Sequence, residues 1–176
     1  MRKNRDTFIK WLFLLSAVVA LSACGFHLRG KPDLPFKTIY LSVPPTSAVG
    51  IQLKRYLRAA GITVTDEKKD AEAIFQLLAE SREQKILTLN TLGQVSEYML
   101  YQRSTFTVTD SKGEALVRPT EIVLKRDMTY NPSQELASQA QMEILYKDMQ
   151  SDLVQQILRR MSSITKTPAV PVKSAE

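Results

Sequence analysis

The sequence is poor in the residues that carry most protein chemistry. Its 176 residues include one cysteine and one histidine. A lone cysteine excludes an intramolecular disulfide, and one histidine beside it cannot supply the ligands of a metal centre. The chain also lacks a G-x-S-x-G turn, a glycine-rich phosphate loop and an H-E-x-x-H motif. We therefore expect no catalytic residues, no metal and no cofactor, which leaves binding and scaffolding as functions.

An apolar run long enough to cross a bilayer is also missing at the start of the chain. Residues 11–21 form an apolar run of 11 residues, whereas a transmembrane helix needs about 20. The run follows a short basic segment and ends in small residues before Cys24. This order is typical of a bacterial secretory signal, so residues 1–23 are predicted to be removed.

Leu21-Ser22-Ala23-Cys24 resembles the lipobox of bacterial lipoproteins. There, a diacylglyceryl group alkylates the cysteine thiol, the signal is cut just before it, and the new amino terminus is acylated. The alternative is an ordinary free or disulfide-bonded cysteine, which the position after a signal disfavours. Each methylene of an acyl chain buried in the membrane contributes about 0.8 kcal/mol to the free energy of membrane binding, so several acyl chains would anchor the mature chain stably.

Gly25, rather than aspartate, follows the predicted lipidation site. By resemblance to enterobacterial lipoproteins, this residue favours the outer membrane, with the chain anchored on its periplasmic side. Four basic residues and one acid fall within residues 1–23, so half of the formal charge of +6 leaves with the signal. The remaining positive charge does not indicate a nucleic-acid partner, and it is compatible with an anionic partner such as lipid phosphate.

The mature chain divides into three parts by composition. Residues 24–36 are rich in glycine and proline and predict an irregular lipidated tether. Residues 37–165 are long enough for a single domain with its own core. Residues 166–176 are small, polar and proline-containing, and predict a disordered tail.

Runs of β-branched and alternating apolar residues predict most of the domain to be strands. They lie at 37–43, 62–65, 73–81, 83–90, 95–109 and 114–128. Pro119, inside the last run, indicates an edge strand or a bulge. We expect an α+β fold: a two-layer α/β sandwich with an about four-stranded, mostly antiparallel sheet and two helices packed on one face.

The two expected helices have amphipathic stripes and recognisable ends. The first is capped by Thr46 or Ser47 and ends before Gly61, which is expected to be left-handed. The second opens at Asn131 and carries a clear apolar stripe over 142–161.

Three short motifs resemble one family, the LptE outer-membrane lipoproteins of lipopolysaccharide assembly. Residues 24–30 (CGFHLRG) resemble the opening of the mature family members. Residues 93–98 (GQVSEY) and 131–132 (NP) are similar to a turn-to-strand segment and to the start of the last helix. The resemblance implies a plug inside an LptD-type β-barrel, which the lipoprotein helps to fold, and binding of lipopolysaccharide on its way to the cell surface.

Lipopolysaccharide carries phosphates, and lysine and arginine bind phosphate well. The candidate contacts are Lys85, Arg103, Lys125 and Arg126. The alternative is that these residues provide solubility and protect strand edges.

Two other functions stay open. One is a lipid-anchored scaffold subunit of another outer-membrane assembly machine, without a lipid ligand. The other is a lipid-anchored periplasmic enzyme, which the missing nucleophile and base disfavour.

Overall fold

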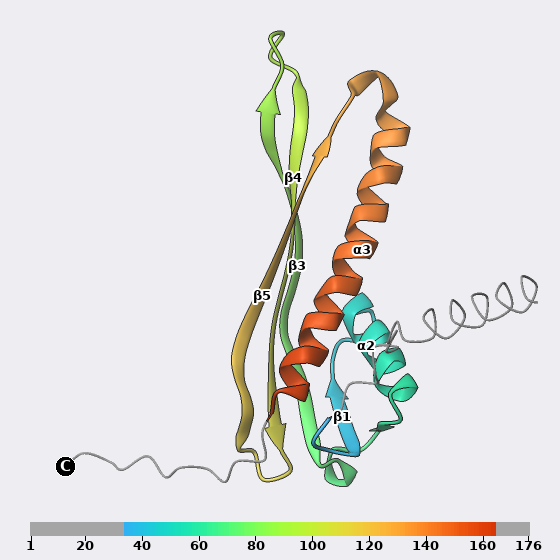
Figure 1. Ribbon diagram of the computed structural model, residues 1–176, viewed down its shortest axis with the longest axis vertical. Coiled ribbons are helices and arrows are strands. Elements are labelled where there is room, and N and C mark those ends of the chain that lie inside the picture. Colours follow the sequence, from blue (N-terminus) through green and yellow to red (C-terminus); the bar gives the residue numbers. More distant parts are fainter. Residues whose placement is uncertain (1–33, 165–176) are drawn as a thin grey trace, which may run out of the picture. The chain divides into compact units, whose positions relative to one another are not determined.

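The computed structural model describes residues 34–164 (Figure 1). The predicted signal at 1–23, the lipidation site at Cys24 and the predicted tail at 166–176 lie outside the described residues. Leu34 and Phe36, at the end of the predicted tether, are buried in the core of the domain.

The described residues form one mixed sheet with two α-helices. The elements are β1 (Thr38–Ser42), α2 (Ala48–Ala59), β2 (Thr63–Thr65), η1 (Lys68–Asp70), β3 (Ala73–Leu89), β4 (Val95–Asp110), β5 (Ala115–Thr129), η2 (Pro132–Gln134) and α3 (Glu135–Ser162). The strand order is β2-β1-β3-β4-β5, with β1 parallel to both of its neighbours and the other pairs antiparallel. The predicted α+β sandwich is confirmed, with five strands instead of about four.

β3 joins two runs that the sequence pattern separates. It is a single strand of 17 residues. Its pairing with β4 shifts register between Leu77 and Ala79 and again between Ile86 and Thr88. Each shift inserts a residue that interrupts the two-residue alternation, which explains why the pattern reads as two shorter strands.

The ends of α2 follow from its sequence. The Ser47 hydroxyl accepts a hydrogen bond from the Gly50 amide at 3.0 Å, which satisfies a free amide of the first turn. After the helix, Gly61 has a φ of +88° and reverses the chain toward β2. Both features match the predicted cap and stop.

The start of the last helix differs in detail. The Asn131 side chain accepts a hydrogen bond from the Ser133 amide, as expected of a cap, but the turn that follows is the 3₁₀ helix η2. α3 itself begins at Glu135 and runs for 28 residues.

Both helices lie on the same side of the sheet, which we call the covered face (Figure 1). The largest apolar side chains with no exposed surface come from both helices and from β1, β3 and β4: Ile39, Val49, Leu53, Leu57, Phe75, Leu100, Phe106, Met149, Leu153, Ile157 and Met161. Burial of each such side chain contributes roughly 1.5–3 kcal/mol to the stability of the fold. This layer holds the sheet and the helices together.

The other side of the sheet, which we call the open face, has no helix of the described chain over it. β3, β4 and β5 extend well beyond the short strand β1 (Figure 1). Large apolar side chains are exposed where the β3–β4 hairpin ends, at Ile86, Leu87, Leu89 and Leu92. Within residues 34–164, no helix is long and apolar enough to cross a membrane.

Candidate functional site: a basic cluster on the open face

Strand register brings basic side chains together at the middle of the open face. Tyr101 of β4 lies opposite Glu83 of β3 and Lys125 of β5. Lys85 lies two residues along β3 from Glu83, and Arg103 lies two residues along β4 from Tyr101. Because side chains two residues apart share a face of a strand, all five point to the same side of the sheet.

The three cations surround the tyrosine ring. The centre of the Tyr101 ring is 5.4 Å from Lys85 Nζ, 5.2 Å from Arg103 Cζ and 5.5 Å from Lys125 Nζ. These distances allow attraction between each cation and the negative face of the ring. We call Lys85, Tyr101, Arg103 and Lys125 the Tyr101 cluster.

One carboxylate partly neutralises the cluster. Glu83 Oε1 lies 3.2 Å from Lys85 Nζ, and Glu83 Oε2 lies 3.9 Å from Arg103 Nη2. Among the described residues, Lys125 has no carboxylate oxygen within 4.0 Å. The cluster with Glu83 therefore keeps a net positive charge, on side chains that present several N–H donors to an anion.

The fourth predicted contact, Arg126, lies on the covered face. It is paired in register with the buried Leu100. Its Nη2 donates to Asp152 Oδ2 of α3 at 2.8 Å. The structure thus brings together Lys85, Arg103 and Lys125 and places Arg126 elsewhere, in a salt bridge between sheet and helix.

Sequence reasoning missed Tyr101 and Glu83. The alternation of apolar and polar residues shows which side chains share a face within one strand. It does not show which residues of neighbouring strands are opposite each other. That register depends on the bulges in β3, which have no clear sign in the sequence.

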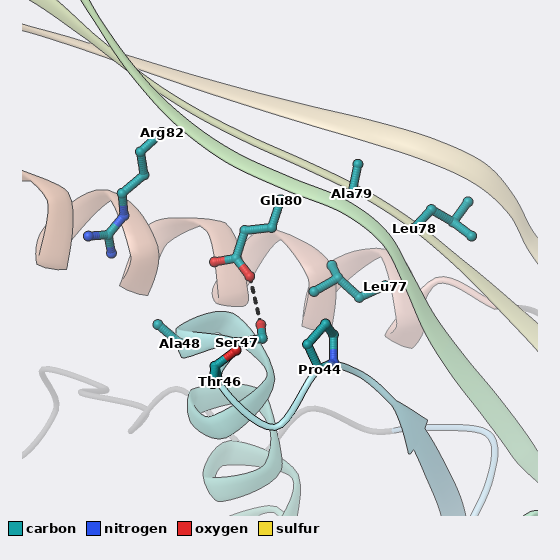
Figure 2. A pocket seen from close by; sticks show the side chains of 9 residues that line it. All are labelled: Pro44, Thr46, Ser47, Ala48, Leu77, Leu78, Ala79, Glu80 and Arg82. Carbon is teal, nitrogen blue, oxygen red and sulfur yellow. Dashed lines mark hydrogen bonds between the residues drawn. The ribbon is translucent and has the colours of Figure 1, made fainter.

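A second candidate is an open pocket between the start of α2 and β3, shown in Figure 2. It has a volume of about 410 Å³ and is lined by Pro44, Thr46, Ser47, Ala48, Leu77, Leu78, Ala79, Glu80 and Arg82. The Glu80 carboxylate accepts a hydrogen bond from the Ser47 hydroxyl at 2.6 Å. Arg82 donates to the Gln150 side chain at 2.9 Å and lies 5.0 Å from the centre of the Tyr146 ring. Both charged side chains are thus held by structural partners that join β3 to the helices.

Tyr146 links α3 to β3 at Glu83, the residue whose side chain lies in the cluster. Its hydroxyl donates to the Glu83 carbonyl at 3.0 Å. Burial raises the pKa of Tyr146 above its ordinary value, and nearby Glu143 and Glu83 add to this effect while Arg82 opposes it. The phenol therefore stays protonated at neutral pH and remains a donor.

The described residues contain no group of three or more histidine, cysteine, aspartate and glutamate side chains that could hold a metal ion.

Comparison with known proteins agrees with this fold. The profile of the LptE family, described as lipopolysaccharide-assembly, matches residues 36–161. The chain is 26% identical to the LPS-assembly lipoprotein LptE of Yersinia enterocolitica over 178 residues, which cover 96% of this chain and 81% of the relative. It is 25% identical to the protein of the same name from Yersinia pestis over 163 residues, which cover 87% of this chain and 75% of the relative.

Solved structures of bacterial lipoproteins have the same architecture. Lipoprotein B from Nitrosomonas europaea superposes with a TM-score of 0.69 at 38% identity, covering 79% of this chain and 91% of that one. Rare lipoprotein B from Shewanella oneidensis gives a TM-score of 0.64 at 28% identity, covering 72% and 94%. The family profile spans most of the chain, and the chain therefore belongs to the LptE lipopolysaccharide-assembly family.

Proposed function

We propose that this chain is an outer-membrane lipoprotein that plugs and helps assemble an LptD-type β-barrel, and that it binds lipopolysaccharide during delivery to the cell surface. Membership of the lipopolysaccharide-assembly family supports the general role. The observation that carries the binding part is the Tyr101 cluster, in which three cations lie within 5.5 Å of the centre of one ring.

The cluster suits the phosphates of lipopolysaccharide. Arginine can hold two phosphate oxygens at once, and lysine adds compact positive charge. Lys85, Arg103 and Lys125 come from three neighbouring strands, so the register of the sheet brings the three cations together before a ligand binds. We propose these three residues, positioned by Tyr101, as the contacts of a lipopolysaccharide phosphate.

The open face also suits the interior of a barrel. The lumen of an outer-membrane barrel is polar and accepts a polar, charged surface. The central part of the open face is of this kind, because Glu83, Lys85, Arg103 and Lys125 lie on it. The exposed apolar side chains at the hairpin end are the type of surface that a partner covers in a complex.

The anchor belongs to the same proposal. Acylation of Cys24 would keep the domain on the periplasmic side of the outer membrane, next to an integral barrel. The proposed role is binding and assembly, with no enzymatic step and no cofactor.

The test is purification of the tagged chain from detergent-solubilised outer membranes. We expect a stable one-to-one complex with an LptD-type barrel that also retains lipopolysaccharide. Recovery of the chain without such a barrel would contradict the proposal. Recovery with a different assembly machine and no lipopolysaccharide would support the scaffold function instead. A Cys24→Ala variant serves as a control, because it should lose acyl labelling and outer-membrane fractionation.

A further inference from the structure

We propose that the Tyr101 cluster selects phosphate groups over carboxylates, because a phosphate can contact all three cations, whereas the carboxylate of Glu83 contacts only two of them. The inference rests on the proposed function for the identity of the lipid. The preference for one anion over the other follows only from the positions of Glu83, Lys85, Arg103 and Lys125.

Glu83 acts as a tethered competitor at this site. Its two oxygens face two of the three cations, at 3.2 Å from Lys85 and 3.9 Å from Arg103. A group held on the same strand competes at a high effective concentration, on the order of millimolar or more. An incoming carboxylate has the same charge and the same two oxygens as Glu83, so exchange of one for the other gains little free energy.

A phosphate monoester offers more than Glu83 does. It carries a charge of about −1.5 to −2 at neutral pH and three acceptor oxygens. It can therefore contact Lys125, which Glu83 does not reach, in addition to Lys85 and Arg103. The third cation thus distinguishes a phosphate from a carboxylate.

Glu83 can also leave its position at low cost. Its side chain is 44% exposed, so the carboxylate can turn into water when a phosphate arrives. Without a ligand, it reduces the repulsion between Lys85 and Arg103. The Tyr101 ring lies within 5.5 Å of all three cations, which makes Tyr101 a positioning residue, and Lys125 is the residue that distinguishes the two anions.

The experiment titrates the full chain, purified in detergent micelles, with inorganic pyrophosphate or with galacturonate. The readout is the NMR shift of the Tyr101 and Lys85 amides and of the Arg103 Nε–H group. We expect pyrophosphate to bind roughly tenfold more tightly than galacturonate, because more charge-assisted hydrogen bonds form. Glu83→Gln should tighten pyrophosphate binding by roughly three- to tenfold, the scale of two exposed ion pairs. Galacturonate binding should tighten by no larger factor, because both anions displace Glu83 and pyrophosphate carries the greater charge. Lys125→Ala should weaken pyrophosphate binding more than galacturonate binding, so that the preference narrows.

The matched control is Asp66→Asn. It removes the same charge from an exposed carboxylate that pairs with Lys54, far from the cluster in the fold. This variant should leave both affinities unchanged. Equal binding of the two anions by the unmodified chain, no shift with pyrophosphate, or an unchanged preference in Lys125→Ala would each overturn the inference.

A parallel titration with intact lipopolysaccharide separates this inference from the proposed function. Lipopolysaccharide binding with an unchanged anion preference in Lys125→Ala would support the proposed function and reject the inference. A preference for pyrophosphate that narrows in Lys125→Ala, without any binding of lipopolysaccharide, would support the inference and reject lipopolysaccharide as the ligand.

Discussion

Lys125 and Arg126 are neighbours in the sequence and lie on opposite faces of the sheet. Lys125 is on the open face, 5.5 Å from the centre of the Tyr101 ring. Arg126 is on the covered face and is held by Asp152 of α3 at 2.8 Å. The two residues have similar chemistry, and the side of the strand on which each lies decides whether a partner within the chain takes up its charge.

The same contrast extends over the two faces. On the covered face, two arginines donate hydrogen bonds to side chains of α3: Arg82 to Gln150, and Arg126 to Asp152. On the open face, Glu83 pairs with two of the three cations, Lys85 and Arg103, and does not reach Lys125. The covered face therefore provides the stability of the fold, and the open face keeps charge available for a ligand. The following substitutions test this division.

The largest effect should come from the aromatic core of the covered face. Phe75 has no exposed surface and stacks on Phe106 with ring centres 5.4 Å apart. Phe75→Ala should lower the free energy of unfolding by about 3–5 kcal/mol, because it removes buried apolar area and leaves a cavity. Chemical denaturation of the two proteins measures the difference. The control, Tyr101→Ala on the open face, should cost clearly less, and an equal cost would break the comparison.

Gln102 and Ser104 are buried polar side chains on the covered face whose polar atoms have no partner within the described chain, and Gln102 is the larger. It is completely buried, and neither atom of its amide group has a hydrogen-bond partner within the described chain. Gln102→Leu should raise the free energy of unfolding by about 1–2 kcal/mol, because the cost of burying an unpaired amide disappears. A higher midpoint of thermal unfolding would show this gain. A lower midpoint would mean that the amide makes a stabilising interaction.

Tyr146→Phe tests one link between α3 and β3. Loss of the hydrogen bond to the Glu83 carbonyl should cost about 1 kcal/mol of stability at neutral pH. Burial raises the pKa of this phenol above 10.0 in the folded chain, so folding favours the protonated form. The stability that the phenol provides should thus be complete below pH 10 and decline as the pH rises through the folded-state pKa. Denaturation across this range should show the two proteins converging, and a constant difference would contradict the assignment.

Arg126→Ala should have the smallest effect. Its salt bridge with Asp152 is partly exposed, and such pairs contribute about 0.2–1 kcal/mol. The variant should unfold slightly more easily in denaturant and bind lipopolysaccharide as the unmodified chain does. A loss of binding would place Arg126 in the ligand site and remove the distinction between the faces.

The sequence predicts the architecture well because most of its signals are local. Ser47 and Gly61 mark the ends of α2, and Pro119 marks β5, which is the edge strand opposite β2. The alternation of apolar residues identifies β4 and the distinct sides of each strand. Such features depend on residues close together in the chain.

The candidate site is harder to predict because it depends on strands being aligned. Lys85, Arg103 and Lys125 could be named as basic residues on strands, but their meeting at Tyr101 requires the register of three strands. The β3–β4 pairing has register shifts on both sides of the cluster, and the β4–β5 pairing has its own shifts between Phe106 and Thr109; none has a distinctive residue pattern. The face of Arg126, in contrast, follows from alternation alone, because Arg126 lies two residues after Leu124 and shares its covered face.

The central claim is that the open-face cations bind lipopolysaccharide, and its direct test is a binding measurement on a triple variant. Lys85→Ala, Arg103→Ala and Lys125→Ala are combined in the full chain. The matched control removes three exposed lysines elsewhere in the described domain: Lys68, Lys112 and Lys147. Both variants have the same net charge, so a difference between them reports position.

We expect the Tyr101-cluster variant to lose roughly tenfold or more in affinity for lipopolysaccharide and to bind with a weaker dependence on salt, because charge-assisted contacts are lost. The control variant should retain most of its affinity, and both should unfold near the midpoint of the unmodified chain. Equal affinities of the two variants for lipopolysaccharide would contradict the assignment of the open face as the ligand site.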